Sequence, residues 1–137
     1  MPKPNDVWIA SGVRTPFAKV DGALQALDAI ELSVPVARHM VDLLKGDRPD
    51  FAVWGAVVPS LMWSNLAREV LMDAGIDPTT PAFSTVMACS TSMIGAIEAA
   101  GMIDGDAYDL ALVGGVDSLS RVQVGLGQRL SDRIAAA

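Results

Sequence analysis

Residues 83–102 read FSTVMACSTSMIGAIEAAGM, and they place an apolar strand directly before a helix. The run Phe83–Ala88 is typical of a strand that is buried on both of its faces. From Ser90 to Met102, small and apolar residues predict a helix that can pack closely against its neighbours. Cys89, the single cysteine of the chain, stands at the junction of the two elements.

The same alternation of strand and helix continues on both sides of this stretch. We expect further strands at Val7–Ala10, Phe51–Val58 and Leu110–Val113, and further helices at Asp28–Lys45 and Asn65–Ala74. The order β-α-β-α-β-α-β predicts an α/β fold with a mostly parallel sheet, right-handed crossovers and helices on both faces.

Several residues indicate where the helices begin and end. Asp28 is expected to cap the first helix, and Gly46 and Gly75 are expected to end the first and second. Pro35 lies inside the first helix and predicts a kink or a late start there. The segment Gly127–Ala137 has the sequence of another helix beginning, or of a fraying tail.

Composition excludes several classes of function. The net charge is −6 and no basic stripe is present, so we expect no nucleic-acid partner. A single cysteine rules out an intramolecular disulfide and a zinc site of clustered cysteines. No apolar run approaches the ~20 residues of a transmembrane helix, and no signal peptide is recognisable at the start. We therefore expect a soluble protein of the cytoplasm or another reducing compartment.

Cys89 is the candidate for chemistry because of its position. Ligands of open α/β sheets bind outside the carboxyl ends of the strands, which is where this thiol is expected. The unpaired N–H groups of the following helix favour a thiolate and can stabilise an oxyanion. Free cysteines are also among the most buried residues, so an inert, buried thiol is the alternative that the residues alone leave open.

Four segments resemble the amino-terminal part of the thiolase family. They are Val13-Arg14-Thr15-Pro16-Phe17 with Gly22-Ala23-Leu24, Asn65-Leu66-Ala67-Arg68 with Ala74-Gly75, Met87-Ala88-Cys89-Ser90-Thr91-Ser92, and Gly114-Gly115-Val116-Asp117-Ser118-Leu119-Ser120. The resemblance covers nearly the whole chain, from about Val7 to Leu130. Two positions depart from the usual pattern: Val86 replaces asparagine and Ser92 replaces glycine. The resulting Ala-Cys-x-x-Ser variant is more similar to 3-ketoacyl-CoA thiolases than to biosynthetic acetoacetyl-CoA thiolases.

The resemblance implies an acyltransferase in which Cys89 is the nucleophile and carries the acyl group as a thioester. Its substrates would be 3-ketoacyl-CoA and coenzyme A, with no covalently bound cofactor and no metal. It also implies that residues 1–137 form a single truncated amino-terminal domain, with Gly127–Ala137 at the start of a missing loop region. In thiolases a histidine and a second cysteine from the carboxy-terminal half complete the site, so we expect the isolated chain to be inactive.

Two other functions stay open. The chain could be a non-catalytic assembly or binding module derived from a thiolase half, pairing as a homo-oligomer or with a complementing half. A related condensing enzyme, such as a ketoacyl synthase, is the weaker alternative, because the segments at Arg14 and Gly114 favour a thiolase.

The remaining polar candidates are expected to be structural. His39, the only histidine, matches no catalytic motif and is expected at the surface or in packing. Arg14 could bind an anion, although an exposed or interface role is favoured. The pair Gly114-Gly115 either lets substrate approach the backbone or forms a tight turn. Asp117 and Ser118 are expected to cap or orient that turn.

Overall fold

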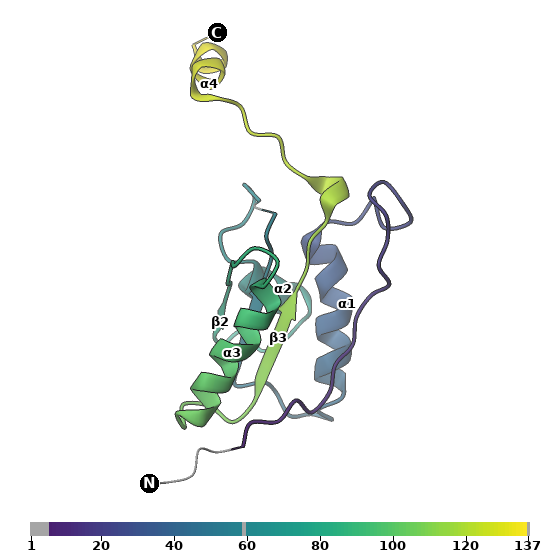
Figure 1. The fold of residues 1–137 in the computed structure, drawn as a ribbon, viewed down its shortest axis with the longest axis vertical. Helices are drawn as coiled ribbons and strands as arrows, with labels where there is room; N and C mark the ends of the chain where they lie inside the picture. Colours follow the sequence, from purple (N-terminus) through teal and green to yellow (C-terminus); the bar gives the residue numbers. More distant parts are fainter. Residues whose placement is uncertain (1–5, 59, 137) are drawn as a thin grey trace.

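The computed structural model describes residues 6–58 and 60–136. Its helices are α1 (Ala29–Asp42), α2 (Leu66–Asp73), α3 (Thr91–Asp104) and α4 (Gln128–Ala135), and its strands are β1 (Phe51–Gly55), β2 (Ala82–Phe83) and β3 (Ala111–Gly115), with the short 3-10 helix η1 (Leu119–Arg121) after β3. Strands and helices alternate from α1 to β3, so the predicted α/β class is confirmed (Figure 1).

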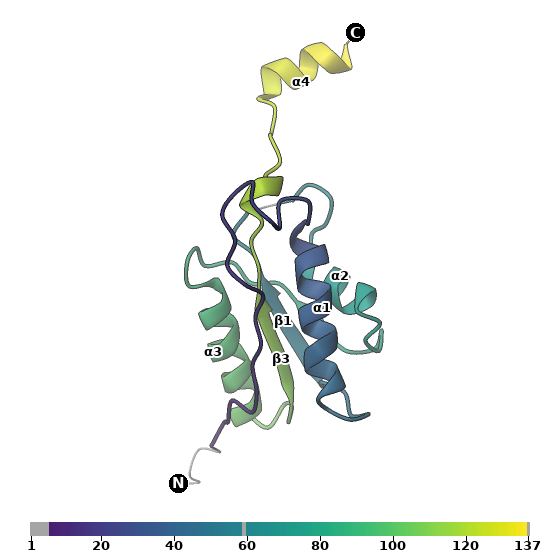
Figure 2. The ribbon, with the colours of Figure 1, turned by 90° about the vertical axis from the view of Figure 1, so that its right-hand side faces the viewer.

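The three strands form one parallel sheet in the order β2-β1-β3. Because β1 is central, the chain moves one way along the sheet from β1 to β2 and the other way from β2 to β3. Right-handed crossovers then place the connecting helices α2 and α3 on opposite faces. Figure 2 shows this arrangement, with α1 and α2 covering one face and α3 the other.

Burial on both faces of β1 divides the core in two. All five residues of β1 are buried, as predicted for a strand covered on both sides. Ala52 and Trp54 pack with α1 and α2, whereas Phe51 and Val53 pack with Ala99 of α3. The alternation follows from the period of two along a strand, and it fixes α3 against the sheet.

Helix α1 shows how far local signals determine an element. The Asp28 carboxylate accepts from the N–H of Glu31, and the Glu31 carboxylate accepts from the N–H of Asp28, which is a complete capping box. The helix therefore begins at Ala29, and the late start expected from Pro35 is wrong. The helix ends at the C-cap Leu43, and Gly46 lies in the following turn with φ of +110°.

The predicted strand at Val7–Ala10 is wrong. Trp8 and Ile9 are 81% and 92% exposed, and the segment follows an irregular path (the purple chain in Figures 1 and 2). A strand needs a neighbour to satisfy its N–H and C=O groups, and no strand of the described residues pairs with this segment.

Two other strands are shorter than predicted. β1 ends at Gly55 instead of Val58, because the N–H groups of Val57 and Val58 bond to a side chain and not to a strand. β2 covers only Ala82–Phe83, and the chain then runs without ladder bonds toward residue 87. The segment after β3 leads through η1 to α4, which confirms the helix expected near the end of the chain. No residue of α4 is buried (Figure 1, yellow).

Candidate active site

Cys89 lies in a tight turn between β2 and α3, as the sequence predicts. The N–H of Ser90 donates to the carbonyl of Met87 at 3.0 Å, so Ala88 and Cys89 are the central residues of the turn. Ala88 has φ of +44°, a left-handed conformation that is unfavourable for any residue except glycine. The thiol of Cys89 is exposed rather than buried, so the structure does not match the inert alternative.

Thr91 bonds to both sides of the strained residue. Its hydroxyl donates to the carbonyl of Ala88 at 2.7 Å and accepts from the N–H of Met87 at 2.8 Å. The N–H of Thr91 also donates to the Ala88 carbonyl, at 3.2 Å. Thr91 is only 5% exposed, so water competes little for these bonds.

Two glycines allow the residues after this turn to pack closely against the carboxyl ends of β1 and β3. A Cβ added to Gly55, the last residue of β1, would overlap Cγ2 of Thr91 and lie 2.6 Å from the carbonyl oxygen of Thr85. A Cβ added to Gly115, the last residue of β3, would lie 2.9 Å from Cβ of Ser92. Gly55 is not among the residues predicted to matter for the site, and its only signal in the sequence is a glycine inside the expected strand Phe51–Val58.

One of the two interpretations of Gly114-Gly115 is wrong. Both residues belong to β3 and form no tight turn, and both line a surface cleft between residues 13–20, α1 and the end of β3. A Cβ at Gly114 would overlap the ring of Trp54, and Gly115 lies against Ser92. The pair is therefore a close-packing feature beneath two larger side chains.

The amino end of α3 supplies positive partial charge beside the thiol. The helix has no side-chain cap and no acidic residue in its first turn. The N–H groups of Ser90 and Thr91 bond within the turn, whereas that of Cys89 makes no hydrogen bond within the described residues. Unpaired N–H groups at a helix start can donate to an anion, such as an oxyanion that forms on a carbonyl group beside the thiol.

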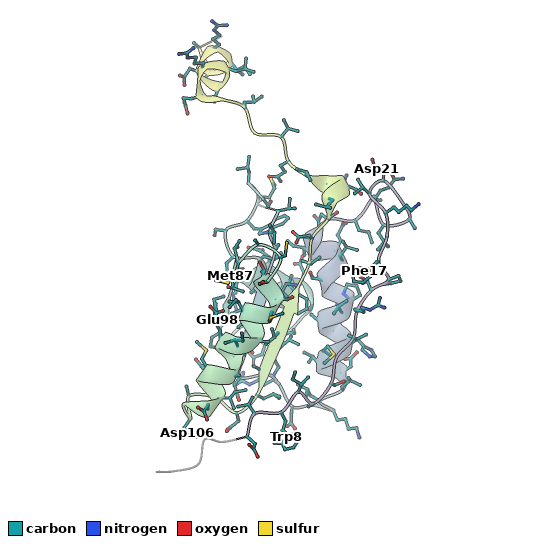
Figure 3. The ribbon with its side chains drawn as sticks, in the orientation of Figure 1. Trp8, Phe17, Asp21, Met87, Glu98 and Asp106 are labelled. Carbon is teal, nitrogen blue, oxygen red and sulfur yellow. The ribbon has the colours of Figure 1, made fainter. Side chains whose placement is uncertain are left out.

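The structure keeps the other sequence candidates away from Cys89. His39 is exposed on α1, which covers the opposite face of the sheet from α3. The Arg14 guanidinium lies 5.0 Å from the ring centre of Phe17, and Phe17 projects beside α1 in Figure 3. Neither residue can act on the thiol in this arrangement.

Asp117 does not orient a turn at Gly114-Gly115, because that pair lies within β3, and it instead joins two strand ends. Its carboxylate accepts from the N–H groups of Val57 and Val58 at 2.9 and 2.8 Å, and so ties the end of β3 to the end of β1. The neighbouring Ser118 hydroxyl donates to the carbonyl of Leu27.

Cys89 lines neither of two surface clefts among the described residues. One, of about 360 Å³, lies between residues 13–20, α1 and the end of β3. Another, of about 400 Å³, lies between the start of α1, residues 60–63 and residues 117–123. Among residues 6–58 and 60–136, no three His, Cys, Asp or Glu side chains are grouped so as to hold a metal ion. No helix within those same ranges combines the length and apolar character needed to cross a membrane.

An apolar surface surrounds the thiol and continues down α3. Val86 and Met87 are 68% and 52% exposed beside Cys89, and Met93 and Ile97 are 65% and 59% exposed on the helix. Met87 lies at the amino end of α3 in Figure 3, and Glu98 farther along it. The only charged residues of α3 are Glu98 and Asp104. A helix that is apolar on all sides is normally covered on all sides.

Fold and turn together define a class of protein: an α/β unit with a thiol where the carboxyl edge of a parallel sheet meets the start of a helix. The family model for the amino-terminal domain of thiolase matches residues 7–136, and the chain belongs to the thiolase family.

Individual relatives agree with this family. The 3-ketoacyl-CoA thiolase of Shewanella halifaxensis is 32% identical over 127 residues, which are 91% of this chain and 29% of the relative. The 3-ketoacyl-CoA thiolase of Photobacterium profundum is 32% identical over 132 residues, 95% of this chain and 30% of the relative. The crystal structure of the Bacillus anthracis acetyl-CoA acetyltransferase superposes with a TM-score of 0.81 at 27% identity, covering 85% of this chain and 30% of that one. The chain thus spans less than a third of the length of these relatives.

Proposed function

We propose that this chain is the nucleophile-bearing part of a thiolase-type acyltransferase, with Cys89 as the acyl acceptor. The observation that carries the proposal is the exposed thiol in a strained turn at an uncapped helix start. Catalytic groups are often held in such conformations, because the strain persists only where the surroundings impose it. The names of the relatives support 3-ketoacyl-CoA as the substrate class.

In the proposed reaction the Cys89 thiolate attacks the 3-keto carbon. The tetrahedral oxyanion is stabilised by donors that include the N–H of Cys89. The C2–C3 bond then breaks, its electron pair leaves with C2, and a proton added at C2 gives acetyl-CoA. The acyl group remains on sulfur as a thioester. Coenzyme A thiolate attacks that thioester, the new acyl-CoA leaves, and the Cys89 thiolate is restored.

The described residues supply the nucleophile and one oxyanion donor, but no acid or base. His39 is the only histidine of the chain and lies beyond the sheet from Cys89, and there is no second cysteine. The proton transfers at sulfur and at C2 therefore require groups from elsewhere, as the family resemblance implies. We expect no cleavage of acetoacetyl-CoA by the 137-residue chain alone.

Isotope exchange tests acyl transfer without those groups. Labelled coenzyme A is mixed with unlabelled acetyl-CoA and the purified chain, and label entering acetyl-CoA is measured over time. Direct thiol–thioester exchange gives a background rate, and transfer to Cys89 and back adds to it, so we expect the rate to exceed that with glutathione at equal concentration. Cys89→Ser should abolish the excess. Exchange no faster than with glutathione would refute the proposal, and so would exchange that survives Cys89→Ser.

Two narrower points belong to the same proposal. An acetoacetyl-CoA thiolase is the alternative within the family, supported by the superposition on an acetyl-CoA acetyltransferase. Repeating the exchange with longer acyl-CoA substrates separates the two. The reaction also needs a reduced thiol, which fits the cytoplasm or another reducing compartment.

A second function, assembly without catalysis, is favoured by the amount of exposed surface. The chain exposes 9575 Å², whereas a compact protein of its mass, 14.3 kDa, exposes about 6,800 Å². Part of the excess belongs to the extended segment after β3, and part to the apolar side of α3. A stable interface buries about 800 Å² per partner, so the excess is ample for a second copy or a complementing thiolase half. An assembly that forms without any exchange activity would favour this function.

A further inference from the structure

We infer that Thr91 is the positioning residue of the thiol, holding the Cys89 turn in its strained conformation through its hydroxyl. This inference rests on the proposed role of Cys89 and adds a residue to that site. Thr91 touches neither the sulfur nor a substrate in the structure, so any effect on the reaction passes through the turn.

The backbone at Ala88 is strained. Ala88 has φ of +44°, a conformation that is unfavourable for alanine, and its methyl side chain forms no hydrogen bond that could compensate. The conformation must therefore be imposed by neighbouring bonds. Relaxation of Ala88 would rotate the peptide that leads into Cys89, and would move both the thiol and the free N–H of Cys89.

The Thr91 hydroxyl is placed to hold Ala88 in this conformation. Its oxygen accepts from the N–H of Met87 at 2.8 Å and donates to the carbonyl of Ala88 at 2.7 Å, and these two backbone groups lie on either side of the strained φ angle. The methyl group of Thr91 faces Gly55, where even one extra carbon would overlap it. The side chain is thus held by the end of β1 while its hydroxyl holds the turn.

Two matched pairs of variants isolate the hydroxyl. Thr91→Val replaces it with a methyl group of nearly equal size. Thr91→Ser keeps it and removes only the methyl group that faces Gly55. If Thr91→Val does not fold, Thr91→Ala compared with Thr91→Ser makes the same test, because these two variants differ by the hydroxyl alone.

The readout is the rate of Cys89 alkylation by iodoacetamide between pH 6 and 9, followed by intact mass spectrometry beside a thermal melt. Loss of a hydrogen bond of about 1.4 kcal/mol corresponds to a change of about tenfold in rate. Cys89 in Thr91→Val should therefore be alkylated about tenfold more slowly near neutral pH, and the rate should depend on pH as it does for glutathione. Thr91→Ser should keep the wild-type rate and profile. If Thr91 had a purely structural role, Thr91→Val would lower the melting temperature and leave the alkylation rate and its pH profile unchanged.

The outcomes separate the two proposals. Fast labelling of the wild type with an unchanged rate in Thr91→Val, or in Thr91→Ala relative to Thr91→Ser, overturns the role of Thr91 and leaves that of Cys89 intact. Labelling of the wild type no faster than glutathione overturns both, because no activated thiol then exists to be positioned.

Discussion

At the scale of single residues, the position of Cys89 depends on the strained Ala88 before it and on the two hydrogen bonds of the Thr91 hydroxyl. A cysteine between an apolar strand and a helix is visible in the order of residues, and Cys89 is found there. The positive φ of Ala88 is not visible, because alanine carries no preference for it. The bonds of Thr91 span the turn and depend on its three-dimensional shape, so they too become apparent only in the structure.

One buried hydroxyl gives a test of stability at this scale. Thr80 is 2% exposed, and its Oγ1 has no hydrogen-bond partner in the described part of the chain. A buried polar group without a partner costs about 1–3 kcal/mol, so Thr80→Val should raise the free energy of unfolding by about 1 kcal/mol in urea titrations.

The adjacent threonine is the control. The Thr79 hydroxyl donates to the Asp77 carboxylate at 2.6 Å, so Thr79→Val should not stabilise the protein. A Thr80→Val variant that is less stable than wild type would mean that the hydroxyl has a partner or that valine does not fit.

At the scale of elements, local signals predict helices better than strands. The start of helix α1 is determined by neighbouring residues, because Asp28 and Glu31 form reciprocal hydrogen bonds. A strand depends on residues far away in the chain that pair with it. Val7–Ala10 has the apolar character of a strand, yet nothing in the described residues pairs with it. For the same reason the ends of β1 and β2 differ from prediction, whereas the parallel direction of the strands follows from the alternation.

Substitution by alanine should change the free energy of unfolding in opposite directions at two glycines, one in β3 and one in α3. A Cβ at Gly114 in β3 would overlap the Trp54 ring, and Trp54 is buried and donates to the Ser33 hydroxyl at 3.0 Å. We expect Gly114→Ala to destabilise the fold by about 1–3 kcal/mol in urea titrations, because the sheet and α1 must shift.

Gly101 in α3 supplies the matched control. It is exposed, and apart from its chain neighbours and the backbone of its own helix no atom lies within 4 Å of an added Cβ, so Gly101→Ala should stabilise by about 0.5–1 kcal/mol through helix propensity. Equal effects of the two substitutions would show that packing beneath Trp54 does not decide the cost.

At the scale of the whole molecule, the resemblance predicts the family and the incomplete site, while the structure adds the surface. The single histidine and single cysteine already imply that other groups must complete a thiolase reaction. Which apolar residues are left uncovered could not be read from the sequence, because α3 is apolar on all its sides. The structure shows that its inner side meets the sheet through Gly95 and Ala99, and that Met93 and Ile97 remain exposed.

That surface predicts concentration-dependent self-association of the isolated chain. Ile97→Glu should reduce the association at least about tenfold in sedimentation velocity experiments and leave the melting temperature nearly unchanged, because the charge is buried only in the assembly. Ile134→Glu on α4 is the control, since Ile134 is exposed to the same extent, 59%, but lies away from α3. Equal effects of the two variants, or a monomer at all concentrations, would contradict an interface on α3.

The most direct test of the account is the location of an acyl group on the chain. The purified protein is incubated with acetyl-CoA, quenched in acid and digested, and acetylated peptides are mapped by tandem mass spectrometry. We predict a thioester on Cys89 that hydroxylamine removes and that added coenzyme A returns to acetyl-CoA. A chain that carries no acetyl group on Cys89, or that is acetylated only on lysines, would contradict the role assigned to this thiol.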